Sequence, residues 1–187
     1  LSVEEFSDNL KCIGRAGAGY NNIPVDEATK KGIVVFNTPG ANANAVKELV
    51  VCGLLLASRG IVQGSVFSSS LESPDDNALN QSVEQAKKTF KGNEVQGKTL
   101  GIIGLGAIGS MVAQSAASLG MKIIGYDPHI SIDAAWRLPS DVEKASSIPA
   151  LLKKSDYISI HVPLIDETKN LIDSEAFMAM KTGTKLI

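Results

Sequence analysis

One run of glycines, set between a short apolar segment and a helix-like segment, limits the fold of this chain more than any other feature. Residues 100–103 are apolar, the run G-L-G-A-I-G follows at 104–109, and a helix-like segment comes directly after it. A second apolar segment, residues 122–126, ends at Asp127. Short apolar strands that alternate with helices are typical of a parallel sheet covered on both faces. We therefore expect an α/β fold built on a doubly wound parallel sheet.

The same alternation continues to the last residue. A helix is expected at 148–154, a strand at 157–162, a further helix at 174–181 and the start of a strand at 184–187. A half-strand leaves ladder groups unpaired and an apolar edge open. The chain also opens on Leu1, with no Met. We therefore expect the chain to be truncated at both ends.

The glycine run has the pattern of a dinucleotide-binding turn. Gly104 permits the tight turn, Gly106 lets a pyrophosphate approach the backbone, and Gly109 lets the helix pack close to the strand. The helix start at Ala107–Ile108 offers free N–H groups and the positive end of the helix dipole to the phosphates. Asp127, roughly 20 residues further on, can accept hydrogen bonds from both ribose hydroxyls and would repel a 2′-phosphate. The sequence therefore predicts NAD, rather than NADP, as the cofactor.

Two further polar positions are candidates for a functional site. His161 ends a predicted strand, at the edge where ligands bind in such sheets. It fits either a general base or a loop beside the cofactor, and the HVPL segment that leaves the strand favours the loop. Arg15 stands beside Gly17 and Gly19, which fits an anion site made of a guanidinium and loop N–H groups. A plain surface arginine fits equally well.

Composition and charge argue against several classes of function. The formal net charge of -2 and the 5% of aromatic residues give no basic face and no stacking platform, so no nucleic-acid partner is expected. Cys12 and Cys52 lie in apolar runs without metal-ligand spacing, and we expect them to be buried, reduced and not part of a metal site. No signal peptide or membrane-length apolar run is evident, so we predict a cytoplasmic location and no membrane partner.

The middle of the chain divides into an apolar helix and a polar stretch. Residues 45–57 are apolar nearly all round the predicted helix, so we expect burial on several sides. We also expect a homodimer or higher homo-oligomer, with the dimer formed through this helix. Residues 66–81 are rich in Ser, Asp and Asn without a clear period, and we predict a surface loop there. A polar helix is expected after this loop, at about residues 82–89.

Several blocks, in this order, resemble the D-isomer-specific 2-hydroxyacid dehydrogenases: GRAGAGYNNIPVDEATKKGIVVFNTPGANANAVKEL, GKTLGIIGLGAIG, GYDP and HVPLIDETKNLI. The resemblance covers essentially the whole chain. It implies that residues 1–43 are the remnant of a substrate-binding domain and residues 44–187 a Rossmann NAD-binding domain, incomplete at its C-terminal end. It also implies that the catalytic Arg, Glu and His of the family lie beyond Ile187. We therefore expect no catalytic residue in this chain, and no activity from it alone.

The resemblance also assigns binding residues and a substrate class, a small 2-hydroxy acid. Those expected to bind the cofactor are Gly104, Gly106, Ala107, Ile108, Gly109, Asp127, Pro128, His161, Val162, Pro163 and Thr168. Those expected to bind the substrate are Arg15, Ala18, Gly19, Asn42 and Arg59. Within the family the match favours the branch that oxidises 3-phosphoglycerate, which would give the two arginines a phosphate to bind. The alternatives are a dehydrogenase of glycerate, glyoxylate or lactate, or an NAD-sensing module like the corepressors built on this fold.

Overall fold

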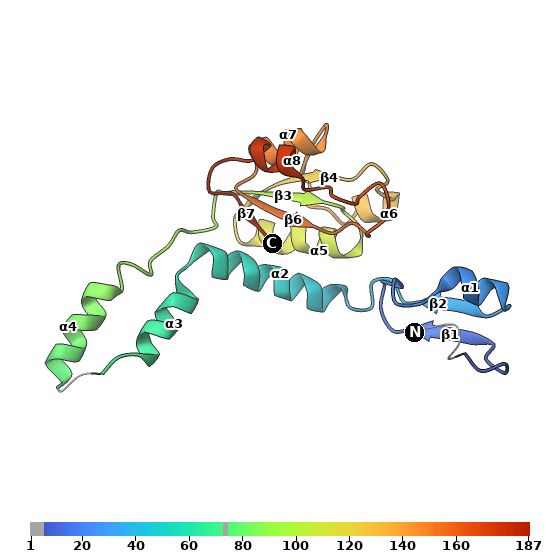
Figure 1. Cartoon of the computed structure of the whole chain (residues 1–187). Helices are drawn as coiled ribbons and strands as arrows, with labels where there is room; N and C mark the ends of the chain where they lie inside the picture. The colour runs from blue at the N-terminus through green and yellow to red at the C-terminus, as the bar shows by residue number, and fades with distance from the viewer. Residues whose placement is uncertain (1–5, 73–74) are drawn as a thin grey trace.

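A computed structural model describes residues 6–72 and 75–187, and the larger of its units is built on a five-stranded parallel sheet (Figure 1). The strand order is β5-β4-β3-β6-β7, and every neighbouring pair runs parallel. The strands are β3 (Thr99–Ile103), β4 (Lys122–Tyr126), β5 (Glu143–Lys144), β6 (Tyr157–Ile160) and β7 (Lys185–Leu186). The predicted doubly wound α/β sheet is therefore confirmed.

Helices cover both faces of this sheet (Figure 1). Helix α5 (Ala107–Ser118) lies on one face, while α7 (Ile148–Lys154) and α8 (Ser174–Ala179) lie on the other. The short helix α6 (Ile132–Ala135) follows β4. Successive strand residues point to opposite faces, so Ile102 packs in the α5 cluster and Ile103 in the α7 cluster. Both side chains are almost completely buried, which explains why these strands are apolar throughout.

A smaller unit is joined to the sheet by one long helix. Strands β1 (Cys12–Arg15) and β2 (Val34–Asn37) pair in parallel, and α1 (Val25–Lys30) connects them. Helix α2 (Ala43–Ser58) then runs along α5 and adds Val50 and Leu54 to the core on that face of the sheet. The predicted domain boundary between residues 43 and 44 falls at the start of α2 but stays a prediction, and residues 1–5 of the predicted first part lie outside the described residues.

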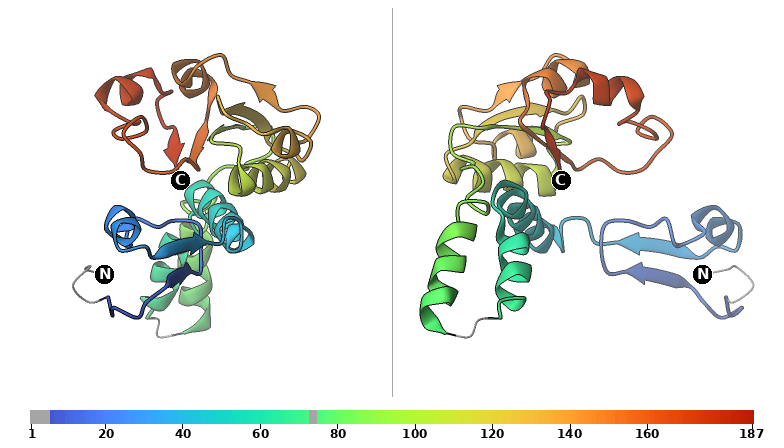
Figure 2. Two further views of the ribbon diagram at one scale, coloured as in Figure 1. Left: turned by 90° about the vertical axis from the view of Figure 1, so that its right-hand side faces the viewer. Right: turned by 60° about the vertical axis from the view of Figure 1, so that its left-hand side comes forward.

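Two helices, α3 (Ile61–Ser69) and α4 (Asp76–Ala86), project from the end of α2 as an arm (Figure 2). The prediction of a loop at 66–81 and a helix only from about residue 82 was therefore wrong, apart from residues 73–74, which lie outside the described residues. The serines that suggested a loop instead bond back along α3, as Ser69 Oγ does to the Ser65 carbonyl at 3.0 Å. At the start of α4, the Asp75 carboxylate accepts the Ala78 N–H at 2.8 Å and caps the helix.

Helix α2 buries one face only. Its uncovered face carries Leu49, which is 73% exposed, together with Cys52 and Leu56. Cys12 is exposed as well, so the expected burial of both cysteines was wrong. For Cys52 the reason is geometric, since a helix that lies on α5 leaves half its circumference uncovered.

Among the described residues, no single helix has both the length and the apolar composition to cross a membrane. Helices α2 and α3 would satisfy both conditions if taken as one segment, but they are bent by 70° relative to each other.

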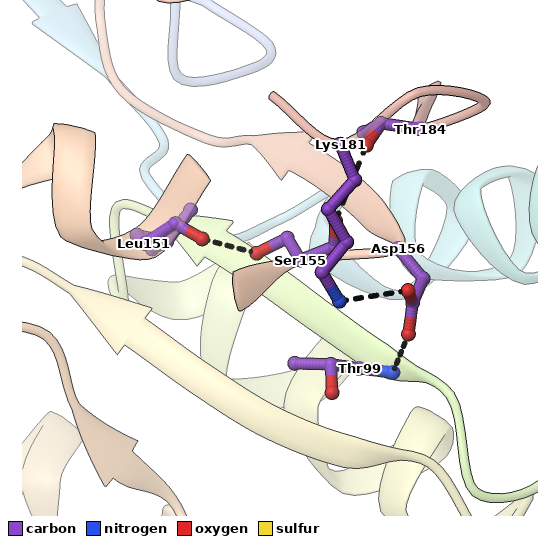
Figure 3. Close-up of polar contacts among 6 residues, drawn as sticks. All are labelled: Thr99, Leu151, Ser155, Asp156, Lys181 and Thr184. Carbon is purple, nitrogen blue, oxygen red and sulfur yellow. Dashed lines mark hydrogen bonds and ion pairs between the residues drawn. The ribbon is translucent and has the colours of Figure 1, made fainter. Parts of the chain in front are cut away.

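Polar contacts tie together the amino ends of β3, β6 and β7 (Figure 3). The Asp156 carboxylate accepts the Thr99 N–H at 2.8 Å and an ion pair from Lys181 Nζ at 2.9 Å. Thr184 Oγ1 donates to the Ser155 carbonyl at 3.2 Å. Partial burial acts to raise the pKa of Asp156, but the Thr99 and Lys181 hydrogen bonds and the charges of Lys181 and Lys98 outweigh it and lower that pKa.

These contacts predict an acid-sensitive contribution to stability. Because the pKa of Asp156 is lowered in the folded chain, its contribution is present above the unfolded pKa of about 3.9 and is lost as the pH falls through the folded pKa. We expect Asp156→Ala to lower the free energy of unfolding by about 1 kcal/mol near neutral pH and by much less in acid. Urea unfolding across that range measures the difference. Asp141→Ala, at an exposed loop position, is the control, and a deficit independent of pH would contradict the prediction.

Candidate functional site

The glycine run forms the turn between the carboxyl end of β3 and the start of α5. Gly104 has φ +90°, and a Cβ at that position would lie 2.6 Å from the His161 carbonyl oxygen. A Cβ at Gly109 would lie 2.0 Å from the Gly104 carbonyl oxygen. A Cβ at Gly106 would meet no atom within 4 Å. Two of the glycines are therefore required by packing, and the third faces open space, where a pyrophosphate can approach the backbone.

The start of α5 adds the electrostatic part of an anion site. Gly106 is the N-cap residue of α5, and no side chain caps this helix end. The N–H groups of the first turn, at Ala107–Ile108, therefore keep their capacity to donate, and the twelve-residue helix directs the positive end of its dipole to the same place. The predicted contribution of these residues to phosphate binding fits this geometry.

Asp127 lies against the glycine turn. It follows β4, and its carboxylate accepts the Leu105 N–H at 2.8 Å and the His129 N–H at 2.9 Å. An open cleft of about 560 Å³ adjoins it, lined by Tyr126, Asp127, Pro128, Ile130, Lys144, Ala145 and Ser146. The sequence indicated only Asp127 and Pro128 here. Lys144 and Ser146 were missed because β5 has just two residues, too few for a recognisable strand pattern.

His161 and the loop that follows it close the other side of the turn. The His161 N–H donates to the Ile103 carbonyl at 2.7 Å, and its Nε2 lies 2.8 Å from Ser159 Oγ. Burial lowers the pKa of His161, so the imidazole is neutral near neutral pH. Val162 lies beside the turn as well, since its Cγ1 would be 2.9 Å from a Cβ at Gly104. The structure thus places these two predicted cofactor residues next to the glycines.

Thr168 holds this loop in shape. Its Oγ1 accepts the Ile165 N–H at 2.9 Å and donates to the Pro163 carbonyl at 2.5 Å. Both predicted residues of the loop, Pro163 and Thr168, therefore contact each other. In this structure the hydroxyl of Thr168 is used within the loop, a structural role that the sequence pattern did not indicate.

Three of the predicted substrate residues, Arg15, Ala18 and Gly19, come from the smaller unit. Gly17 has φ +138°, and the Arg15 guanidinium lies so close that a Cβ at Gly17 would be 1.9 Å from its Nη1. The guanidinium also donates to the Ala16 carbonyl. Arg15 therefore lies over the loop that holds Ala18 and Gly19, as an anion site requires.

The loop before α2 connects this unit to the nucleotide turn. A Cβ at Gly40 would lie 3.7 Å from Ala107 Cβ, at the start of α5. Asn42 is the N-cap residue of α2 but makes no capping hydrogen bond with its side chain. Arg59 lies at the opposite end of α2, a helix about 24 Å long, and its Nε donates to the Lys91 carbonyl at 2.7 Å. The structure therefore does not bring Arg59 together with Arg15 within one chain.

Comparison with known proteins places the chain in a family. The family description "D-isomer specific 2-hydroxyacid dehydrogenase, NAD binding domain" matches residues 67–187, and "D-isomer specific 2-hydroxyacid dehydrogenase, catalytic domain" matches residues 3–119. The chain belongs to the D-isomer-specific 2-hydroxyacid dehydrogenases. This membership confirms the predicted family, and the match to its NAD-binding domain confirms NAD as the cofactor.

Individual relatives of this chain carry the names of different activities. It is 42% identical over 185 residues to D-3-phosphoglycerate dehydrogenase of Methanocaldococcus jannaschii, covering 99% of this chain and 33% of that one. It is also 42% identical over 185 residues to hydroxypyruvate reductase of Thermotoga maritima, covering 99% of this chain and 55% of that one. The NAD+-bound 3-phosphoglycerate dehydrogenase of Entamoeba histolytica superposes with a TM-score of 0.71 at 32% identity, covering 96% of this chain and 48% of that one. The chain thus spans about half or less of these relatives.

The packing of the turn predicts that two matched substitutions both weaken NAD binding but differ in their effect on stability. Gly106→Ala adds a methyl group to open space, so we expect unchanged stability and an NAD affinity at least about tenfold weaker. Gly109→Ala forces the helix away from the Gly104 carbonyl, so we expect a loss of about 1–3 kcal/mol in stability as well as of binding. Calorimetric NAD titration and urea unfolding of both variants measure this. Equal stability of the two variants would contradict the assignment.

Proposed function

We propose that the protein is an NAD-dependent D-2-hydroxyacid dehydrogenase. The observation that carries this proposal is the glycine turn, with Asp127 bonded to it at 2.8 Å and Gly106 open to a ligand, in a chain of this family. NAD supplies the hydride acceptor, so that the reaction transfers a hydride between C2 of the acid and C4 of nicotinamide. The part of this work done by the present chain is to bind and orient both molecules.

Each part of the site has a distinct task in this proposal. The turn and the start of α5 bind the pyrophosphate, and Asp127 accepts the ribose hydroxyls and excludes a 2′-phosphate. The loop at Ala18–Gly19 holds the substrate carboxylate by its N–H groups, with Arg15 beside it.

The proposed substrate is 3-phospho-D-glycerate, oxidised to 3-phosphohydroxypyruvate in serine biosynthesis. Supporting it are the 42% identity to a D-3-phosphoglycerate dehydrogenase and the half-buried Arg15, whose guanidinium lies beside the loop at Gly17. The equal identity to a hydroxypyruvate reductase supports the second candidate, another D-2-hydroxyacid dehydrogenase. A third candidate, an NAD-sensing binding module like a corepressor, would bind NAD in the same turn without turnover. A cytoplasmic location is part of the proposal.

An assay of nicotinamide absorbance on the product of the complete reading frame separates these candidates. We expect turnover of D-3-phosphoglycerate with NAD, at a kcat/KM at least about a hundredfold above that for glycerate or lactate, since a phosphate site left empty loses charge-assisted hydrogen bonds. NADP should support little turnover, because Asp127 faces the ribose. Preference for an unphosphorylated acid would move the enzyme to another branch. NAD binding without any turnover would leave only the binding module.

We also propose a homodimer that covers the exposed face of α2. Leu49, Cys52 and Leu56 recur at helical spacing on that face, opposite the residues packed on α5. Leu49→Glu should shift the chain toward monomer in sedimentation equilibrium, because it places a charge in the buried patch. Glu48→Gln, an exposed change beside it, is the control. Monomer alone at high micromolar concentration in the unchanged chain would refute this dimer.

A further inference from the structure

The last residue of β2, Asn37, and the residue after it, Thr38, hold the proposed substrate loop by hydrogen bonds, and both lie outside the predicted site. Thr38 Oγ1 accepts the Gly17 N–H at 2.7 Å, and the Thr38 N–H donates to the Gly17 carbonyl at 3.0 Å. Asn37 Nδ2 donates to the Ala18 carbonyl at 2.9 Å. We propose that Thr38 and Asn37 are positioning residues that set this loop for the substrate carboxylate, an inference that rests on the proposed function.

These hydrogen bonds determine which backbone N–H and carbonyl groups of the loop remain available to a ligand. The hydroxyl of Thr38 also reaches the Arg15 carbonyl at 3.4 Å, so it accepts one bond and donates another. These contacts use the carbonyls of Arg15, Gly17 and Ala18 and the N–H of Gly17. Within the described part of the chain, the N–H groups of Ala18 and Gly19 make no hydrogen bond. Two adjacent donors on one loop are what a carboxylate needs.

The loop conformation depends on these bonds because, apart from the Arg15 guanidinium beside Gly17, little else packs against it. Gly17 has φ +138°, a conformation that other residues rarely adopt, and Gly19 has no atom within 4 Å of a Cβ position. Ala18 is half-buried and Gly19 is exposed. Apolar packing therefore contributes little to the position of the two donors, and the hydrogen bonds from Asn37 and Thr38 are the main constraint on it.

The same segment also passes close to the nucleotide turn. Two residues after Thr38, a Cβ at Gly40 would lie 3.7 Å from Ala107 Cβ, at the helix end expected to face the pyrophosphate. The chain thus runs from the bonds that hold the substrate loop directly to a contact with the cofactor side. A change at Thr38 should displace the carboxylate donors and leave the turn itself, which is fixed by Gly104 and Gly109, in place.

The test compares Thr38→Val, which keeps the shape but removes the hydroxyl, with Thr38→Ser, which keeps the hydroxyl, in the product of the complete reading frame. For Thr38→Val we expect KM for the 2-hydroxy acid to rise about tenfold, with the NAD Kd within about twofold of the unchanged enzyme. Thr38→Ser should restore KM to within about threefold. Asn37→Ala, which removes one exposed bond, should raise KM by about threefold. A KM unchanged in Thr38→Val, or a parallel rise in the NAD Kd, overturns the inference.

A second readout keeps the test separate from the proposed function. Amide hydrogen exchange followed by NMR should show Gly17 protected in the unchanged protein and in Thr38→Ser, and unprotected in Thr38→Val, while Ala18 and Gly19 exchange freely. An enzyme that turns over no 2-hydroxy acid overturns the proposed function and the substrate role of the loop. If the Gly17 N–H stays protected from exchange in Thr38→Val, the inference that Thr38 positions the loop is overturned.

Discussion

The close approach of backbone segments at the β3–α5 turn is the constraint on which the rest of the site depends. The Gly104 carbonyl lies where a Cβ of Gly109 would be, and the His161 carbonyl lies where a Cβ of Gly104 would be. Because these contacts admit no side chain, they fix the start of α5 relative to both β3 and the loop after β6. The helix end, Asp127 and the HVPL loop then converge on one edge of the sheet, at the carboxyl ends of its parallel strands.

Helix α2 has a structural task that explains both its burial and its exposure. One face packs on α5 and completes the core beside the sheet, so the smaller unit is attached to a rigid element rather than to a flexible linker. The opposite face is left without a cover, with Leu49 the most exposed of its apolar residues. This arrangement also separates Asn42 from Arg59 by the full length of the helix, so the two can serve one site only if Arg59 belongs to a neighbouring chain.

The sequence was sufficient where the chemistry is local. The glycine spacing, the apolar strands and Asp127 predicted the sheet and the turn, because each of these needs a residue type at a fixed distance along the chain. The sequence was insufficient where the outcome depends on which groups hydrogen-bond to each other or which helix faces pack together. The serines of α3 suggested a loop, but their hydroxyls bond to helix carbonyls, as that of Ser69 does. The exposure of Cys52 depends on which face of α2 packs against α5. Thr38 bonds to Gly17 across 21 positions, a contact that no local pattern reports.

The two halves of the site are held by different forces, and this difference bears on how the family changes substrate. The nucleotide turn is fixed by steric contacts of glycines inside a packed sheet, which tolerate almost no substitution. The proposed substrate loop is held by a few hydrogen bonds near the surface, one of them partly buried and another exposed, each worth about 1 kcal/mol, so a small number of changes can reshape it without unfolding the chain. Relatives equally similar to this chain, at 42% identity, accordingly carry names of different activities, phosphoglycerate dehydrogenase and hydroxypyruvate reductase. Cofactor identity therefore follows from family membership, whereas we propose that the identity of the acid depends on the loop at Gly17–Gly19 and on the residues that hold it.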